Sequence, residues 1–319
     1  GIALFYLKKY FVAKNALKKS FALNPANEDI ATDLGSISIA TGNPKKSLRF
    51  LKIAQIRDNN MHIVFNNLGA AHSEIGQNKQ AIGYFEKALE VHPLMTEIYI
   101  NMGVVYEKMG KKKKAMAAYQ KALKQDDRNA MAYYNLGVIY KKNKDILKAV
   151  ESWDKAGKLD PKDEKVFANL GWAYESLGKK KKALKEILKS IKLKPFNSKT
   201  HYAAGRIHSD LGNFDKALDS FSKAVKFDPE FGDAYYRMGI AYDNLNESRE
   251  AISNLLIAEI IYHKEKKMAL FKKMGMELKP LLEKYELTRK HFTELQLPDA
   301  LKGYNIHKKP KRIKTSKEK

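Results

Sequence analysis

Residues 130–163 read AMAYYNLGVIYKKNKDILKAVESWDKAGKLDPKD, and the spacing within this stretch decides the fold. Gly137 is followed twelve positions later by a small residue, Ala149, and sixteen positions later by a bulky one, Trp153. Apolar residues three, four and seven positions apart predict amphipathic helices on both sides of the polar run KKNKD, and Pro161 marks the end of the second helix. The stretch therefore predicts two helices joined by a tight turn.

The same arrangement recurs at a fixed interval over most of the chain. One series of glycines has members 34 residues apart, without insertion or deletion: Gly1, Gly35, Gly69, Gly103, Gly137, Gly171, Gly205 and Gly239. With each glycine as position 8 of a repeat, position 20 holds a small residue: Ala13, Ser47, Ala81, Ala115, Ala149, Ala183, Ala217 and Ala251. Position 24 holds a bulky one: Leu17, Leu51, Phe85, Tyr119, Trp153, Ile187, Phe221 and Leu255. A period of this length indicates a stacked-repeat architecture.

This pattern resembles the tetratricopeptide repeat (TPR) over residues 1 to about 263. The resemblance implies an all-α, right-handed superhelical solenoid of antiparallel helix pairs, with a helix A and a helix B in each repeat. We expect a partial repeat, 1–27, and seven full repeats, approximately 28–61, 62–95, 96–129, 130–163, 164–197, 198–231 and 232–265. Proline at position 32 is expected to end helix B in five repeats: Pro25, Pro93, Pro161, Pro195 and Pro229.

Both ends of the chain depart from the repeat. Because Gly1 stands at position 8, the chain opens within a helix A, and we expect the natural protein to continue upstream. Residues 264–298 are predicted to be capping helices, one around Met274 and another beginning at Pro280. Residues 299–319 are predicted to be a disordered basic tail, since residues 302 to 319 hold eight basic residues and one acidic residue.

The amino-acid composition favours some kinds of partner and excludes some kinds of site. The formal net charge of +24, from 60 Lys and Arg against 36 Asp and Glu, favours an acidic partner or an anionic surface. The absence of cysteine excludes disulfides, thiolate metal sites and a thiol nucleophile. No apolar run approaches the ~18 residues of a membrane helix, so no membrane span is expected in this segment.

Position 6 carries asparagine in four successive repeats: Asn67, Asn101, Asn135 and Asn169. The row resembles the asparagine ladder in the superhelical domain of O-linked N-acetylglucosamine transferase, which implies a grip on a peptide backbone through amide donors and acceptors. Four aromatic residues at neighbouring positions are further peptide-groove candidates: Tyr134, Trp172, Tyr202 and Tyr236. The alternative is structural, because Asn-Leu-Gly is common in such repeats and the aromatic residues are equally suited to packing. The residue set of the carboxylate-clamp domains, which hold chaperone C-termini, is missing.

Positions 16 to 19, at the turn from helix A to helix B, are unusually basic. Two repeats fill all four places with lysine: Lys111, Lys112, Lys113 and Lys114 in one, and Lys179, Lys180, Lys181 and Lys182 in the other. Lysine at a helix start opposes the helix dipole at a cost of about 0.3–1 kcal/mol per charge. The rows therefore suggest a polyanion-binding rim, which the tail would extend with Lys308, Lys309, Lys311 and Arg312. The alternative is a solvated lysine-rich surface.

No catalytic, metal or cofactor motif is present. The eight histidines form no His-Glu-x-x-His pattern, and His201 and His208 occupy positions expected to pack in the core. Phosphate-loop and nucleophile-elbow motifs are missing as well. We therefore expect a protein that is not an enzyme and that has no cofactor and no metal.

Two function hypotheses remain. The first is a non-catalytic protein–protein interaction scaffold that binds a partner segment in the concave TPR groove. The second is a polyanion-binding, adhesin-like module that uses the lysine rim and tail on a glycosaminoglycan or another anionic surface; nucleic acid is the weakest ligand, because the basic runs lack interleaved aromatic residues. The Lys-, Asn- and Ile-rich composition is similar to that of the C-terminal TPR region of a spirochaete surface-located membrane protein, which implies a bacterial cell envelope location, with the cytoplasm as the alternative.

Overall fold

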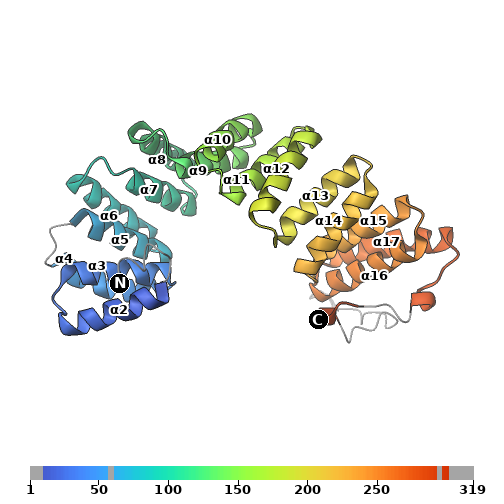
Figure 1. The fold of residues 1–319 in the computed structure, drawn as a ribbon, viewed down its shortest axis with the longest axis horizontal. Helices are drawn as coiled ribbons and strands as arrows, with labels where there is room; N and C mark the ends of the chain where they lie inside the picture. The colour runs from blue at the N-terminus through green and yellow to red at the C-terminus, as the bar shows by residue number, and fades with distance from the viewer. Residues whose placement is uncertain (1–9, 57–60, 293–296, 302–319) are drawn as a thin grey trace, which may run out of the picture. The chain divides into compact units, whose positions relative to one another are not determined.

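The computed structural model describes residues 10–56, 61–292 and 297–301. All regular secondary structure in these ranges is helical, which confirms the all-α class (Figure 1). The chain divides into two compact units, Gly1–Asp160 and Pro161–Lys319. The expected continuous array over residues 1–263 crosses this boundary and stays a prediction.

The first unit consists of antiparallel helix pairs, in which each helix A packs on its own helix B (Figure 1). Each helix B also contacts the next helix A, so the pairs stack in chain order. Of the partial repeat, the described residues contain the helix B, α2. The helices are α2 (Tyr10–Leu23), α3 (Glu28–Ala40), α4 (Pro44–Gln55), α5 (Met61–Glu74), α6 (Asn78–Val91), α7 (Thr96–Lys108), α8 (Lys112–Gln125), α9 (Ala130–Lys142) and α10 (Ile146–Leu159).

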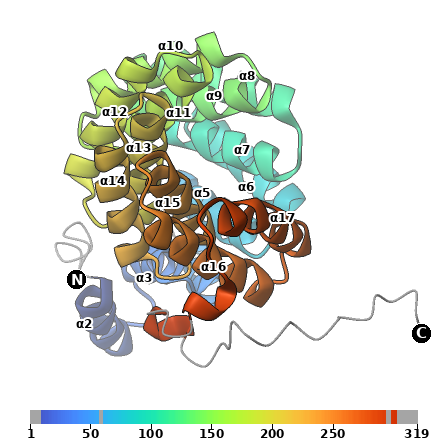
Figure 2. The same cartoon turned by 90° about the vertical axis from the view of Figure 1, so that its right-hand side faces the viewer.

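The second unit repeats this arrangement, and its last two α-helices are longer than the others. Figure 2 shows α15, α16 and α17 packed in sequence order. The helices are α11 (Glu164–Ser176), α12 (Lys180–Leu193), α13 (Ser198–Asp210), α14 (Phe214–Phe227), α15 (Gly232–Asn244), α16 (Ser248–Lys264) and α17 (Met268–Lys284), followed by the 3-10 turns η1 (Arg289–Phe292) and η2 (Asp299–Leu301). Every helix B before a position-32 proline ends two residues earlier, as predicted.

The repeat glycine is required by the bulky residue at position 24. A Cβ atom at Gly69 would lie 2.5 Å from the Phe85 ring, and one at Gly171 would lie 2.5 Å from the Ile187 side chain. Carbon atoms in contact are about 3.5–4.0 Å apart, so any side chain at these glycines would push helix A away from helix B. The sixteen-residue spacing seen in the sequence is thus a steric requirement of the helix crossing.

A residue in the left-handed conformation closes each turn from helix A to helix B. Five of the turns use glycine, with φ between 70° and 81°: Gly42, Gly76, Gly110, Gly178 and Gly212. Lys144 and Asn246 take the same conformation, at φ 63° and 61°. Asparagine tolerates it, whereas lysine does so at a cost of about 1–2 kcal/mol. Lys144 is therefore a strained residue.

The C-terminal cap differs from its prediction. α17 runs unbroken through Pro280, so the predicted separate helix after this proline is wrong. Pro280 and Met276, whose carbonyl loses its helical donor, are both exposed, so solvent can reach that carbonyl in place of the missing N–H. The chain after α17 instead packs Phe292 and Leu301 into the core formed with α14, α15 and α16. None of the described helices is long and apolar enough to cross a membrane.

Candidate functional site

In the first unit, the helix A residues that face neighbouring A helices form a mostly polar surface. We call it the first-unit wall; its members are the residues at positions 2, 5, 6, 9, 12 and 13 of α3, α5, α7 and α9, and they include Asp33, Ser36, Asn66, Asn67, Asn101, Val104, Met131, Tyr134 and Asn135. The wall contains three of the four predicted ladder asparagines.

Two of these asparagines brace neighbouring helices. Asn67 Nδ2 donates to Ser36 Oγ on α3 at 2.9 Å, and Asn101 Nδ2 donates to Asn66 Oδ1 on α5 at 3.0 Å. Each bond uses one amide N–H and leaves the rest of that amide to other partners. Asn67 and Asn101 thus have a structural role, which the sequence analysis raised as the alternative to binding.

The third asparagine is different. Asn135 on α9 is half-buried and has no hydrogen-bond partner among the residues that the structure describes. The backbone of α9 next to Asn135 is anchored to the core, because Trp153 Nε1 donates to the Tyr134 backbone carbonyl at 3.1 Å. Asn135 therefore presents an amide on a firmly placed backbone.

Ion pairs link the A helices along the edge of the wall. Lys108 Nζ lies 3.0 Å from both Ser73 Oγ and Glu74 Oε1 on the preceding helix A. Lys142 Nζ lies 2.7 Å from Glu107 Oε2. These carboxylates are neutralised within the protein, so they offer little charge to a partner.

Asp33 differs from these paired carboxylates. It takes position 6 on α3, where the next three repeats have asparagine, and it has no hydrogen bond or ion pair within the described residues. Burial, with a smaller contribution from Asp29, raises the pKa of the Asp33 carboxyl. The wall also exposes apolar side chains at Ile63, 39% exposed, Val104, 36% exposed, and Met131, 61% exposed.

The second unit carries the remaining groove candidates, and two of them are already engaged. The Tyr202 ring lies 4.8 Å from that of Phe231, and Tyr236 donates through its hydroxyl to Glu277 at 3.3 Å. Both tyrosines pack against the core of this unit. Asn169 and Trp172 are half-buried on α11. The aromatic candidates Tyr202 and Tyr236 are thus explained by packing.

The lysine rim divides into engaged and free side chains. Lys114 lies 5.8 Å from the Tyr106 ring, Lys182 lies 5.8 Å from the Tyr174 ring, and Lys180 donates to the Asp210 carbonyl at 2.9 Å. The other five rim lysines have no partner within the described residues: Lys111, Lys112, Lys113, Lys179 and Lys181. Neither helix start has a capping side chain or an acidic residue in its first turn.

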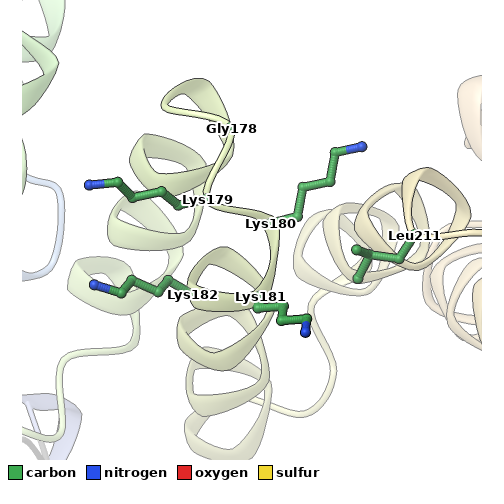
Figure 3. Close-up of a pocket in the computed structure, with 6 residues that line it drawn as sticks. All are labelled: Gly178, Lys179, Lys180, Lys181, Lys182 and Leu211. Carbon is green, nitrogen blue, oxygen red and sulfur yellow. The ribbon is translucent and has the colours of Figure 1, made fainter.

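One of the two lysine rows borders a surface hollow of about 480 Å³ together with Gly178 and Leu211. Figure 3 shows Lys179 and Lys182 pointing to one side of the turn, and Lys180 and Lys181 pointing to the side on which Leu211 lies. The four ammonium groups do not converge, so the geometry does not form a single small-anion site. The tail candidates Lys308, Lys309, Lys311 and Arg312 lie outside the described residues.

Part of the lysine surplus has a packing explanation. In four successive repeats the position-26 lysine lies within 6 Å of the position-4 aromatic ring of the same repeat: Lys87 with Phe65, Lys121 with Tyr99, Lys155 with Tyr133 and Lys189 with Phe167. A cation above an aromatic face is stabilising by about 0.5–1 kcal/mol when exposed. These lysines cover the aromatic edge of the core.

The two histidines of α13 that were expected to pack, His201 and His208, lie at the core. His201 is 7% exposed, its ring lies 5.5 Å from that of Phe227, and its Nε2 lies 2.8 Å from the Pro195 carbonyl oxygen. His208 has a buried Nδ1 without a partner in the described structure, and burial, followed by nearby Lys216, lowers the pKa of its imidazole. In the described ranges no group of His, Asp or Glu is arranged to hold a metal ion.

Sequence analysis missed four wall residues. It did not single out Asp33, Ile63, Val104 or Met131. An acid at the ladder position and apolar residues at positions 9 and 2 were visible signals. Their exposure, however, depends on how neighbouring repeats cover them.

Comparison with known sequences and structures agrees with this fold. Sequence models described as TPR repeat match residues 108–144 and 205–246, and models described as tetratricopeptide repeat match residues 64–92, 130–163 and 164–197. No curated protein matches the chain.

Solved TPR structures are similar as well. YrrB, a TPR protein with an unusual peptide-binding site, is 26% identical, with 59% of this chain and 97% of YrrB covered and a TM-score of 0.53. PilF of Pseudomonas aeruginosa is 20% identical, with coverage of 68% and 97% and a TM-score of 0.59. The Cut9–Hcn1 assembly of the APC/C is 18% identical over 85% of this chain, with a TM-score of 0.59, and the match spans 54% of that chain's length. Together with the helix pairs and the 34-residue glycine series, these matches place the chain in the tetratricopeptide-repeat family.

Proposed function

We propose that this chain is a non-catalytic scaffold that holds an extended segment of a partner protein against the first-unit wall. TPR folds serve as protein-interaction scaffolds, and the similarity to YrrB, which has a peptide-binding site, supports the same role here. The proposal concerns the segment-binding site rather than the identity of the partner.

The observation that carries the proposal is the unused amide of Asn135. Its neighbours Asn67 and Asn101 each donate to the preceding helix A, whereas Asn135 has no such bond within the described residues. An unpaired, half-buried amide has both donors and an acceptor for a peptide backbone. The exposed Met131 side chain beside it adds apolar area that a bound segment would cover.

Peptide display offers a direct test. A random peptide library is selected on the whole chain, and the selected peptides are titrated against wild type, Asn135→Ala and Asn101→Ala by isothermal calorimetry. We expect Asn135→Ala to weaken binding about fivefold or more with unchanged stability, because it removes no internal bond. Asn101→Ala is expected to lower stability by about 0.5–1.5 kcal/mol, since it loses an internal hydrogen bond. Failure to select any peptide, or peptides insensitive to Asn135→Ala, would refute the wall as a binding site.

A second candidate function, polyanion binding at the lysine rim, is supported by the five lysines that have no internal partner in the described structure. Because the ammonium groups diverge, the fitting ligand is an extended anionic polymer such as a glycosaminoglycan rather than a small anion. Binding of this kind weakens steeply as salt rises.

A charge-matched pair of variants tests this candidate on immobilised heparin over a salt series. One variant changes the row Lys179, Lys180, Lys181 and Lys182 to glutamine, and the control changes four exposed helix B lysines, Lys124, Lys158, Lys192 and Lys226. A rim site predicts elution at much lower salt for the first variant alone. Equal shifts for both variants would mean that only net charge matters.

A further inference from the structure

The first-unit wall has an uneven distribution of charge that bears on what it binds. Its carboxylates at Glu74 and Glu107 are each paired with a lysine of the following helix A. Asp33 is half-buried and has no such partner in the described residues. Two further wall carboxylates without an ion pair in the described residues, Asp29 and Glu97, are exposed, so Asp33 is the partly buried member of this unpaired set.

Asp33 is not explained by helix capping. Asp29 lies in the first turn of α3, where a negative charge is favoured by the helix dipole. Asp33 lies one turn further on, beyond the reach of that effect, and burial works against its charged form. A partly buried carboxylate is stabilised when a cationic group approaches, so this position favours a basic ligand group.

The apolar part of the wall lies on other helices. Ile63 lies on α5, Val104 on α7 and Met131 on α9, and the amides Asn67 and Asn101 lie beside them on α5 and α7. Packed helices are about 8–10 Å apart, so α5, α7 and α9 lie one, two and three steps, or about 8–10 Å, 16–20 Å and 24–30 Å, from α3. An extended chain advances about 3.3 Å per residue, which converts these distances to about three to nine residues.

From this juxtaposition we infer that the partner segment is extended and carries a basic side chain opposite Asp33 and an apolar side chain about three to nine residues away, opposite Ile63, Val104 or Met131. The inference rests on the proposed scaffold function and specifies the chemistry of its ligand. Asn67 and Asn101 each keep one amide N–H and the amide oxygen beside their internal bond, and these groups would bind the backbone without reading the intervening side chains.

A defined peptide series tests the inference. Fluorescent 14-residue peptides, acetylated and amidated, carry one arginine and one leucine separated by one to eleven Ser and Gly residues, and fluorescence anisotropy against the whole chain gives their affinities. We expect the tightest binding at separations of about three to nine residues. Replacing the arginine with glutamine is expected to weaken binding at least fivefold.

Two variants locate the charge effect. Asp33→Asn introduces the residue that three neighbouring repeats already hold at this position, so the fold is expected to be retained. It should weaken binding of the arginine peptide at least fivefold and leave the glutamine peptide unchanged. Glu90→Gln removes the same charge from an exposed site on α6, a helix B, and should change neither affinity by more than twofold.

The outcomes separate the inference from the function beneath it. Equal loss with Asp33→Asn and Glu90→Gln, or no dependence on the separation, would overturn the inference while leaving segment binding intact. If no peptide of the series binds, the inference is overturned, and the unbiased display selection decides the proposed function on its own.

Discussion

Replacing Gly137 with alanine is expected to destabilise the first unit, even though alanine is the better helix former. The new Cβ atom would overlap the indole of Trp153, which is completely buried. Trp153 cannot move away freely, because its Nε1 donates to the Tyr134 carbonyl at 3.1 Å. The substitution therefore destabilises the unit through a steric clash and a weakened hydrogen bond, and it stabilises the unit only through helix propensity.

The magnitude follows from three contributions. Inserting a methyl group into a packed core costs about 1–3 kcal/mol. Loss of the indole hydrogen bond adds about 0.5–1.5 kcal/mol if the ring is displaced. The gain in helix propensity from glycine to alanine offsets about 0.8–1 kcal/mol. We expect the free energy of unfolding to fall by about 1–3 kcal/mol.

Gly83→Ala is the matched control. Gly83 lies inside α6 of the same unit, and a Cβ atom there would meet nothing within 4 Å. This substitution should raise the free energy of unfolding by about 0.5–1 kcal/mol. Urea unfolding followed by far-ultraviolet circular dichroism measures both. If Gly137→Ala proved as stabilising as Gly83→Ala, the steric account of the 34-residue glycine series would be wrong.

Three further substitutions test other features by urea unfolding. Lys144→Gly should raise the free energy of unfolding by about 1 kcal/mol, because Gly110 holds the same left-handed position without strain; no gain would refute the strain. Arg289→Met should lower the free energy of unfolding by about 1.5–3 kcal/mol, because the buried Glu259 carboxylate loses its two hydrogen bonds from Arg289, of 2.6 and 2.8 Å. Adding Glu259→Gln should restore part of this loss. His208→Tyr should stabilise the second unit and flatten its stability between about pH 7 and 5. The pKa of this histidine is lowered in the folded state, so wild-type stability falls as pH drops below the ordinary value of ~6.5; an unchanged pH dependence would contradict this.

The C-terminal cap and the left-handed turns show where the sequence pattern loses its predictive value. Pro280 reads as a helix boundary because proline removes a backbone donor, yet α17 continues through it. Lys144 reads as an ordinary surface lysine, yet the turn forces it to φ 63°. Both depend on packing and chain closure around the residue rather than on the residue itself.

In the candidate site, too, residues that look alike in the sequence differ in the structure. Asn67, Asn101 and Asn135 look equivalent in the sequence, because each occupies position 6 of its repeat. In the structure two of them brace a neighbouring helix, whereas Asn135 has no internal partner within the described residues. The difference arises from the residue on the preceding helix A, which is Ser36 or Asn66 for the braced amides. Local periodicity carries no information about that partner.

The sequence alone determined the repeat length, the helix pairs and the TPR family, because the close crossing of helix A and helix B demands glycine at one position and a bulky residue sixteen places later. Only the tertiary structure decided which polar and apolar side chains are already used. The pairing of Glu107 with Lys142 and the lack of a described partner for Asp33 depend on contacts between repeats. Such contacts join residues about 34 positions apart, and their strength depends on distances of a few ångströms that residue spacing does not encode.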